Sequence, residues 1–544
     1  MSLEHISYAW DKNHWTLDPD LPVVLRHFWP GWAEAQADLE HYGKLAGREV
    51  YETCYHVDHE APPVLVQYDV DGRRVDRVRL APAERDLLRE LAPVMRPPYE
   101  GGSWHHHYAL GYLIADPGLF CVLTITQQTV YAIHKYAPEH AEWKEKILAG
   151  EAFGATWMTE NQGGSDLGAN RARAVNENGT WRIYDGDKYF ASGAGLTDVA
   201  ITTARPEGAP DGPKGLALFL LPRLDAKGEL NFRVRRLKDK TATRAVPSGE
   251  VELDGAEAWL IGKAEEGIYY ALENLTVSRL TNATAAMGIA RKAAFEVAGR
   301  VTHRRSFGKP LIEHPLVRRD LTDMAVRLAG GTALAFRAVA DFDRVWKEPP
   351  PFGEAYHAAR FWSHLAKVRT ADHAAAVTQM AMELFGGLGF LGEYAVERWH
   401  REALITPIWE GPANIQSLDM LEAMAKKHAH EPFVAEVSGL LERAATDEAE
   451  LARKLLDETL AAQAAAADRS EAEWLAKRTL TRLADIASVA LLYDLAGTGG
   501  ERYARLAGLY ARRFLADEEY PAWVASESDL FRLVADQAGG NDGF

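Results

Sequence analysis

A single glutamate, Glu410, stands between an indole and a glycine–proline turn. The segment Ile408-Trp409-Glu410-Gly411-Pro412-Ala413-Asn414 comes directly before a predicted helix. A carboxylate held against apolar side chains is poorly solvated, so its pKa rises toward the range that a general base for a carbon acid needs. A solvent-facing turn glutamate is the plain structural alternative.

The stretch WMTENQGGSD, from Trp157 to Asp166, concentrates hydroxyl groups and glycine amides at the entrance to a series of predicted strands. Such groups can hydrogen-bond the heteroaromatic edge of a flavin or a nucleotide. A polar hairpin loop is the alternative. Further on, Phe190 and Ser192 are two positions apart in a predicted strand and therefore share one face. A ring could stack on Phe190 there, unless the phenyl group packs in the core.

Three cations, Arg304, Arg305 and Lys309, surround Phe307 and Gly308 directly after a predicted helix. Because arginine binds phosphate oxygens with two parallel hydrogen bonds, this segment is a candidate pyrophosphate clamp. Cations also accumulate at helix C-termini simply to oppose the helix dipole.

The segment GGLGFLG matches the GxGxxG pattern at Gly387, Gly389 and Gly392. A predicted helix rather than a strand precedes it, and the chain shows no βαβ alternation, so a Rossmann dinucleotide site is not expected. The glycines still allow a ligand to approach the backbone closely, although a helix cap and turn would use them equally well.

The composition is that of a globular chain. Of 544 residues 47% are apolar and 26% charged, which excludes a disordered or collagen-like protein. The net charge of −17 disfavours general attraction to nucleic acid or anionic membrane. Cys54 and Cys121 are isolated, so neither a disulfide scaffold nor a zinc site is expected. His105, His106 and His107 would point about 100° apart on a helix, so we expect no metal there.

The first residues lack the basic and apolar segments of a signal peptide, and no apolar run is long enough to span a bilayer. We therefore expect a cytoplasmic protein. The motifs GxSxG, HExxH and GxxxxGK[ST] are absent from the sequence, so hydrolase and nucleotide triphosphatase functions have no motif support.

The chain divides by pattern into four segments. Residues 1–152 are mostly helical by periodicity, and residues 153–261 alternate like the strands of an antiparallel barrel or sandwich. Residues 262–430 have the periodicity of long bundle helices, interrupted by the Pro-rich loop KEPPPFGE, and residues 431–544 form a further helical segment. The predicted fold class is multidomain α+β.

Taken together, these stretches resemble the acyl-CoA dehydrogenase family of flavoproteins over roughly residues 60 to 430. MTE with GSD is similar to the family's flavin loop, GDKYFAS to its flavin-stacking strand, RRSFGK to its RxxFGK signature and FGGLGF to its FGGxGF segment. RLKDK, FGKPLIEHPL and IWEGPANI, with the helical segment beyond residue 430, resemble the AidB branch, which is associated with the adaptive response to alkylation damage. That likeness extends over nearly the whole chain.

The resemblance implies an acyl-CoA dehydrogenase-like fold with a helical N-terminal domain, a middle β domain, a helical bundle that contacts the neighbouring subunit's FAD, and an extra C-terminal helical domain. It implies FAD as cofactor and a homotetramer built as a dimer of dimers. The residues that it places at FAD are Met158, Thr159, Gly164, Ser165, Phe190, Ser192, Arg304, Phe307, Glu383, Gly387, Trp409, Gly411 and Asn414.

Three positions depart from the family pattern. Glu383 stands where many relatives have Gln near the adenosine of FAD, Phe190 where many have Trp, and Pro412 where a hydroxyl residue often contacts the flavin. The resemblance still implies FAD, with altered affinity.

By resemblance, Glu410 removes the α-proton of an acyl-CoA thioester while hydride passes from the β-carbon to flavin N5. The product is a trans-2-enoyl-CoA, and the electrons leave to electron-transfer flavoprotein or another acceptor. The backbone amide of Glu410 and a flavin ribitol hydroxyl polarise the thioester oxygen. Arg279 resembles a family position at the active site and is assigned a supporting electrostatic role.

A competing hypothesis is an AidB-like flavoprotein that binds DNA in the alkylation-damage response, with weak or no dehydrogenase turnover. Arg502, Arg505, Arg512 and Arg513 would form one basic stripe at helical spacing. Residues 431–544 as a whole nevertheless carry 12 Lys plus Arg and 21 Asp plus Glu. A segment that tracks phosphates should be net basic, so DNA binding is not favoured. A flavoprotein with a closed acyl channel is a third hypothesis.

Overall fold

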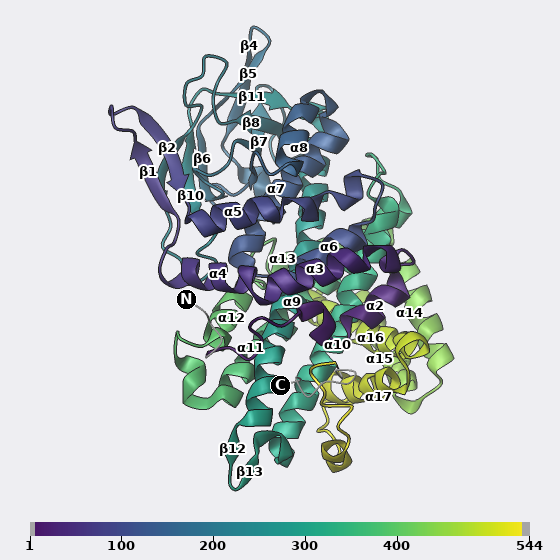
Figure 1. Cartoon of the computed structure of the whole chain (residues 1–544). Helices are drawn as coiled ribbons and strands as arrows, with labels where there is room; N and C mark the ends of the chain where they lie inside the picture. The colour runs from purple at the N-terminus through teal and green to yellow at the C-terminus, as the bar shows by residue number, and fades with distance from the viewer. Residues whose placement is uncertain (1–5, 536–544) are drawn as a thin grey trace. The chain divides into compact units, whose positions relative to one another are not determined.

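The computed structural model describes residues 6–535 and divides into two compact units (Figure 1). Unit 1 contains Met1–Glu52, Ser103–Ala115 and Arg279–Phe544, and unit 2 contains Thr53–Gly102 and Asp116–Ser278. Two of the boundaries between these units fall within helices, α4 (Glu49–His59) and α9 (Gly267–His303). The two units therefore differ from the four consecutive segments expected from the sequence pattern. The segment boundaries at residues 152, 261 and 430 stay a prediction.

Unit 2 is built around two β-sheets. The larger sheet has the strand order β3-β7-β4-β5-β11-β8. Because β7 also pairs with β8, the strands β7, β4, β5, β11 and β8 form a closed ring. The smaller has the order β6-β10-β9. Their strands are β3 (Gly154–Trp157), β4 (Arg173–Glu177), β5 (Thr180–Tyr184), β6 (Gly186–Ser192), β7 (Val199–Pro206), β8 (Ala217–Pro222), β9 (Arg233–Leu237), β10 (Ser248–Leu253) and β11 (Ala256–Leu260).

The predicted β segment is confirmed, but the expectation that all of its strands pair antiparallel is wrong. β7 pairs in parallel with β3, where Gly154 lies opposite Val199, and with β4, where Arg173 lies opposite Arg205. All other pairings are antiparallel. The parallel pairs arise because the chain passes through other strands before it returns as β7, and only such a long connection can join parallel neighbours.

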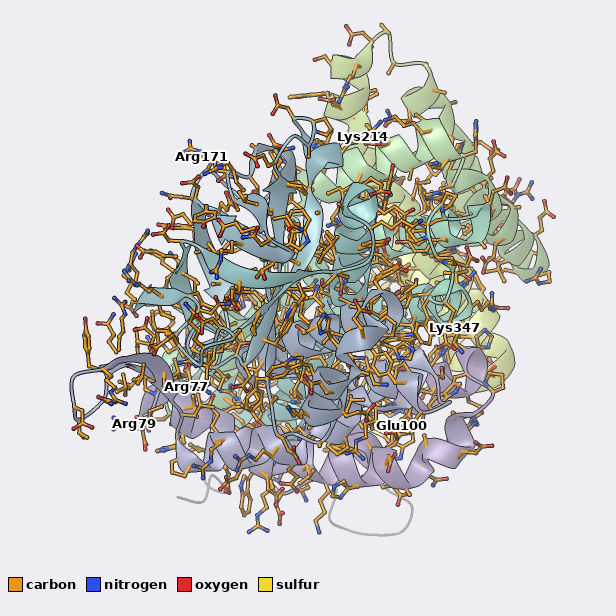
Figure 2. All side chains as sticks on the ribbon, turned by 90° about the horizontal axis from the view of Figure 1, so that it is seen from above. Arg77, Arg79, Glu100, Arg171, Lys214 and Lys347 are labelled. Carbon is orange, nitrogen blue, oxygen red and sulfur yellow. The ribbon has the colours of Figure 1, made fainter. Side chains whose placement is uncertain are left out.

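A two-stranded hairpin interrupts the region that was expected to be helical. β1 (Val64–Tyr68) pairs antiparallel with β2 (Arg74–Arg79), which carries Arg77 and Arg79 (Figure 2). Arg77 donates to Asp198 Oδ1 over 2.9 Å and so ties the hairpin to the β-sheets of the same unit. The alternation VLVQYDVDGRRVDRVR predicts such strands, and the turn DG was the missed signal.

The helices of unit 2 are α5 (Pro82–Glu90), α7 (Pro117–Tyr136) and α8 (Ala141–Leu148), together with the end of α4 and the start of α9. Both α5 and α7 carry proline in their first turn, where the missing N–H would have no helical partner in any case. α7 is buried along most of its length and packs against β3.

Unit 1 is helical apart from the short hairpin of β12 (Arg305–Ser306) and β13 (Lys309–Pro310). Its long helices are α9, α10 (Pro315–Val345), α11 (Glu354–Phe385) and α16 (Arg469–Gly499). The remaining helices are α1 (His14–Leu17), α2 (Leu21–Phe28), α3 (Gln36–Gly47), α6 (Trp104–Leu113), α12 (Ala395–Ala403), α13 (Ala413–Lys427), α14 (His430–Ala444), α15 (Asp447–Ala464) and α17 (Glu501–Tyr510). The Pro-rich segment lies between α10 and α11, as predicted.

Close packing of α10 is visible at two adjacent glycines. A Cβ at Gly330 would lie 2.5 Å from the Tyr510 ring, and one at Gly331 would lie 2.5 Å from Met287 Sδ. These positions therefore let neighbouring helices approach α10 more closely than any side chain would allow. No described helix is both long enough and apolar enough to cross a membrane.

The four C-terminal arginines do not form the basic stripe that the DNA-binding hypothesis requires. Arg502 is 7% exposed and donates to Asp20 Oδ1 over 2.7 Å. Arg505, Arg512 and Arg513 pair with Glu527, Glu518 and Asp323, respectively. The helix also ends at Tyr510 and continues as a π-helical turn over Ala511–Leu515, so the α-helical spacing assumed for the last two arginines does not apply.

Candidate active site

The loop after β3 is fastened to β6 by a buried ion pair. Lys188 Nζ lies 2.8 Å from Glu160 Oε1, and the two residues are 0% and 2% exposed. Burial lowers the pKa of Lys188, and the carboxylate opposes that shift. The amide of Tyr189 also donates to the Thr159 carbonyl over 3.1 Å. Unit 2 therefore places the Met158–Thr159 backbone beside β6.

This arrangement brings together the unit 2 residues predicted to hold a flavin. Phe190 is 54% exposed and does not pack in the core, and Lys238 Nζ lies over its ring, 4.6 Å from the ring centroid. The hydroxyls of Thr159 and Ser165 make no hydrogen bond to any residue within 6–535. Met158 is buried, and its contribution would come from the main chain. An exposed aromatic face beside unused hydroxyls fits the edge and face of a flavin.

Gly164 serves close packing in this loop. A Cβ at that position would lie 2.4 Å from Thr159 Oγ1. A larger residue at 164 would therefore push the Thr159 hydroxyl away from its present position.

In unit 1, the RRSFGK segment forms the β12–β13 hairpin after α9, and Phe307 at its tip is 95% exposed. Arg305 donates to the Gly308 carbonyl over 2.8 Å, and Lys309 donates to the Glu313 carbonyl over 2.9 Å. The Arg304 guanidinium is exposed and has no side-chain partner within the described part of the chain. Of the three cations in the predicted clamp, Arg304 is thus the one that remains available to a phosphate.

The end of α11 leaves the backbone open. Gly386 has φ +66°, and neither Gly386 nor Gly387 would bring a Cβ within 4 Å of another residue. Glu383, on the exposed last turn, accepts a hydrogen bond from Gln379 Nε2 over 3.2 Å. Gly386 caps α11 through an N–H bond to the Glu383 carbonyl, which is the cap-and-turn alternative, and a ligand contact at Gly387 stays a prediction.

Glu410 lies in a turn of unusual backbone conformation, between α12 and α13. Its φ is +57°, in the left-handed region that a residue with a side chain rarely adopts, and Gly411 follows with φ +90°. A Cβ at Gly411 would lie 2.6 Å from Gln416 Nε2, so position 411 requires glycine for space as well. α13 begins at Ala413 directly after Pro412, with Asn414 exposed in its first turn.

The main-chain carbonyls of Pro407, Glu410 and Gly411 in this turn accept hydrogen bonds from side chains. The Glu410 carbonyl accepts from Gln416 Nε2 over 2.8 Å and from Arg279 Nε over 3.4 Å. Lys367 Nζ donates to the carbonyls of Gly411, over 2.9 Å, and Pro407, over 3.3 Å. These bonds come from three different helices, α9, α11 and α13, and they fix the strained turn from several sides.

Asp419 of α13 bonds to Arg279, one of these side chains, and also contacts Arg360 and His364. Its Oδ2 lies 3.0 Å from Arg279 Nη1 and 3.4 Å from His364 Nε2, and its Oδ1 bonds to Arg360. The surrounding cations hold the pKa of Asp419 well below its usual range in spite of its burial. His364 also bonds to Gln416, with 2.7 Å between Nδ1 and Oε1.

Two members of this network titrate abnormally because they are buried. Burial lowers the pKa of His364 to about 3, so the imidazole is neutral at physiological pH. Burial likewise lowers the pKa of Lys367 to about 8, and the nearby Glu410 carboxylate opposes that shift. Lys367 therefore remains largely protonated at pH 7.

Unit 1 thus brings together Trp409, Glu410, Gly411 and Arg279, as predicted. The indole of Trp409 bonds to Asn282 on α9. Sequence reasoning missed Lys367 and the Asp419 network. Their signal was a set of polar residues at helical spacing with apolar neighbours, as at Ser363, Lys367 and Thr370, which are all fully buried on α11.

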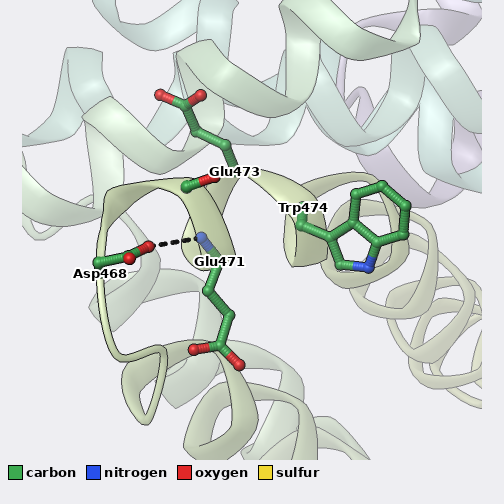
Figure 3. A pocket seen from close by; sticks show the side chains of 5 residues that line it. Asp468, Glu471, Glu473 and Trp474 are labelled. Carbon is green, nitrogen blue, oxygen red and sulfur yellow. Dashed lines mark hydrogen bonds between the residues drawn. The ribbon is translucent and has the colours of Figure 1, made fainter.

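A separate hollow at the start of α16 does not belong to this site (Figure 3). Trp474 there is 86% exposed, and the Glu471 amide donates to Asp468 Oδ1 over 2.9 Å to cap the helix. Carboxylates of Asp468, Glu471 and Glu473 line it, which is the wrong charge for a phosphate-bearing ligand. None of the predicted site residues contributes to it. Among the described residues, no group of three or more His, Cys, Asp or Glu could hold a metal ion.

Three family models match the chain in sequence order. They are the adaptive response protein AidB N-terminal domain over residues 7–152, the acyl-CoA dehydrogenase middle domain over 155–256 and the acyl-CoA dehydrogenase C-terminal domain over 265–425.

Individual relatives agree with these models. The chain is 32% identical to AidB of Escherichia coli strain K12 over 67% of its own length and 70% of that protein. It is 31% identical to 3-methylmercaptopropionyl-CoA dehydrogenase of Ruegeria pomeroyi over 71% and 70% of the two chains. The crystal structure of Caenorhabditis elegans ACDH-11 in complex with C11-CoA is similar, with TM-score 0.81, 26% identity and coverage of 93% and 91%. The chain therefore belongs to the acyl-CoA dehydrogenase family, whose members are FAD-binding oxidoreductases, and its N-terminal region is of the AidB type.

Proposed function

We propose that this protein dehydrogenates an acyl-CoA thioester between its α and β carbons, with Glu410 as the base, to give a trans-2-enoyl-CoA. The observation that carries the proposal is the Glu410 turn. A non-glycine residue with φ +57° persists only where the surroundings enforce it, and here side chains from three helices bond to the turn. Such strain is characteristic of a residue that must project in one direction.

The chain's own part in the reaction follows from this geometry. A Glu410 carboxylate oxygen takes the α-proton, which is acidic enough only when the thioester oxygen is polarised. The amide N–H of Glu410 would donate to that oxygen, and the left-handed turn presents the amide and the side chain together. Arg279 supports the turn through the Glu410 carbonyl and through Asp419. When bound, FAD supplies the hydride acceptor.

The residues available to FAD support the same function, unit by unit. In unit 2, Thr159, Ser165 and Ser192 offer hydroxyls and Phe190 offers an exposed ring. In unit 1, Arg304 offers a guanidinium that has no side-chain partner among residues 6–535, and Gly387 offers main chain with space around it. Phe307, Glu383 and Asn414 are also exposed there. In a homotetramer built as a dimer of dimers, these unit 1 groups would serve the FAD of a neighbouring subunit.

The names of two relatives indicate thioester substrates. The C. elegans structure contains C11-CoA, and the R. pomeroyi protein is named for 3-methylmercaptopropionyl-CoA. We extend to this chain only the shared chemistry, an acyl-CoA substrate, with electron-transfer flavoprotein or another carrier as the electron acceptor. A cytoplasmic location stays a prediction.

DNA binding in the alkylation response has less support. The four C-terminal arginines on which it rested each pair with a carboxylate. Phosphate contacts there would first have to break these pairs.

The experiment is an anaerobic titration of the FAD-loaded protein with short, branched and long acyl-CoAs while flavin absorbance is recorded. Bleaching by one class would identify the substrate. Glu410→Gln should keep FAD bound and lower the rate of bleaching by about a thousandfold or more. Unchanged bleaching by this variant would refute the assignment of Glu410, and absence of bleaching by every acyl-CoA in the wild type would refute dehydrogenation.

A further inference from the structure

Lys367 is a buried cation in the middle of α11 whose ammonium group faces the main chain around Glu410. The residue is 0% exposed. Its Nζ lies 2.9 Å from the Gly411 carbonyl oxygen and 3.3 Å from the Pro407 carbonyl oxygen. It therefore spans the turn and bonds on both sides of the proposed base.

Burying a lysine is unfavourable unless its donors and its charge are both satisfied. The two carbonyls satisfy two of its three N–H groups, and carbonyl dipoles alone do not neutralise a full positive charge. The Glu410 carboxylate stabilises the charged form of Lys367, as the direction of its effect on the lysine pKa shows. The interaction is mutual, because a cation that is stabilised by a carboxylate stabilises that carboxylate in turn.

The other charged groups around Lys367 do not substitute for this interaction. Arg279 of α9 opposes the lysine's charge, and Asp372 on α11 favours it less than Glu410 does. Asp419 of α13 is already engaged by Arg279 and Arg360, and His364 is neutral. Glu410 is thus the carboxylate with the largest favourable effect on Lys367.

We propose that Lys367 is a positioning residue for Glu410, which holds the left-handed turn through the Pro407 and Gly411 carbonyls and supplies the positive charge that keeps the carboxylate ionised before it accepts a proton. This inference rests on the proposed function, since it assigns Lys367 a role in preparing that base. Lys367 acts through the turn and is not itself assigned to the reacting atoms.

The test compares Lys367→Met, which removes the charge and the donors at similar length, with Lys367→Arg, which keeps a cation. Lys426→Met is the matched control, because Lys426 lies in the same unit, its side chain is 68% exposed, and it forms an exposed ion pair with Glu422. All variants are prepared as FAD-loaded protein, and their folding is checked by circular dichroism and thermal unfolding.

The first measurement does not depend on turnover. The carboxyl groups are labelled with a water-soluble carbodiimide and glycine ethyl ester across pH 4.5–7.5, and labelling at Glu410 is quantified by peptide mass spectrometry. Because the reagent attacks the protonated acid, the midpoint for Glu410 should move to higher pH by about one unit in Lys367→Met, and should stay near the wild-type value in Lys367→Arg and Lys426→Met.

The second measurement is the pH profile of flavin reduction by whichever acyl-CoA bleaches the wild type. In Lys367→Met the acid limb should shift upward in parallel with the labelling, and the rate at pH 6 should fall by about tenfold or more. Rescue by arginine would support the role of charge. A folded Lys367→Met variant whose labelling midpoint is unchanged would overturn the proposal.

The two proposals can fail separately. If no acyl-CoA bleaches the wild-type flavin, the dehydrogenase function fails, yet the labelling still tests whether Lys367 controls Glu410. If Lys367→Met does not fold, Lys367→Arg is the deciding variant. A Glu410 labelling midpoint that stays at the wild-type pH in Lys367→Arg would support the charge effect, and a midpoint that moves to higher pH would contradict it.

Discussion

Two buried clusters of charge in unit 1 use the same residue types in opposite ways. Around Asp20, the guanidiniums of Arg291 and Arg502 converge on a carboxylate that is 0% exposed. Around Glu410, the cations bond mainly to the main chain of a strained turn, and Glu410 itself remains partly exposed. The first cluster neutralises its charges internally, whereas the second leaves one carboxylate accessible. The contrast shows that a structural cluster and a candidate site differ in what their cations bond to, and not in which charged residue types the sequence supplies.

Removal of Asp20 should give the largest effect on stability. Asp20→Ala would leave Arg291 and Arg502 buried without their shared anion, and the free energy of unfolding should fall by about 3–5 kcal/mol. Urea unfolding measures this loss of unfolding free energy. Asp517→Ala is the control, because the Asp517 side chain is 97% exposed. A loss no larger than the control's would contradict a structural role for the Asp20 cluster.

Asp419→Asn should affect both stability and the reaction, which separates the second cluster from the first. The substitution leaves Arg279 and Arg360 without their counter-charge, so we expect a loss of about 2–4 kcal/mol in unfolding free energy. Flavin reduction should also slow, by about tenfold, because Arg279 supports the Glu410 carbonyl. Asp20→Ala, where folded, should keep the wild-type rate. Equal rates in both variants would remove the functional distinction.

His364 should make the Glu410 cluster sensitive to acid. Its pKa is about 3 in the folded protein and 6.5 ordinarily, so the unfolded chain takes up the proton first as pH falls. Stability should therefore drop from pH 6.5 downward by about 1.4 kcal/mol per unit, or about 2 kcal/mol by pH 5. His364→Gln should remove that part of the decline in urea unfolding at pH 5, 6.5 and 8. His41→Gln, at an exposed position, should not.

Arg512→Gln should have the smallest effect. Arg512 is 38% exposed and pairs with the exposed Glu518, so the unfolding free energy should change by less than about 1 kcal/mol. Mobility-shift titrations with duplex DNA across salt should not distinguish the variant from the wild type. A steep salt dependence that weakens in this variant would revive the DNA-binding hypothesis.

The long helices of the bundle and the alternation of the β segment could be predicted because each pattern is local. The turn at Glu410 could be predicted for the same reason, since Gly411 and Pro412 mark it. The β1–β2 hairpin was missed although its alternation is also local, because the helical pattern on either side was extended across it. The burial of Lys367 had a local signal in its helical spacing with Ser363 and Thr370, but its partners could not be assigned, because the carbonyls of Pro407 and Gly411 are 40 and 44 residues away in the sequence. The parallel pairing of β7 could not be predicted either, because the sequence pattern of a strand does not indicate which other strands it lies beside.

The left-handed backbone at Glu410 has an evolutionary consequence. Glycine at this position would adopt the same φ without steric cost, which would favour the folded state by about 1 kcal/mol. The same substitution would also remove the carboxylate with the largest favourable effect on the buried Lys367, which offsets the backbone gain. The buried lysine therefore opposes loss of the acid as well as selection for chemistry does, and a descendant of this chain would keep its stability without the acid only if position 367 changed too.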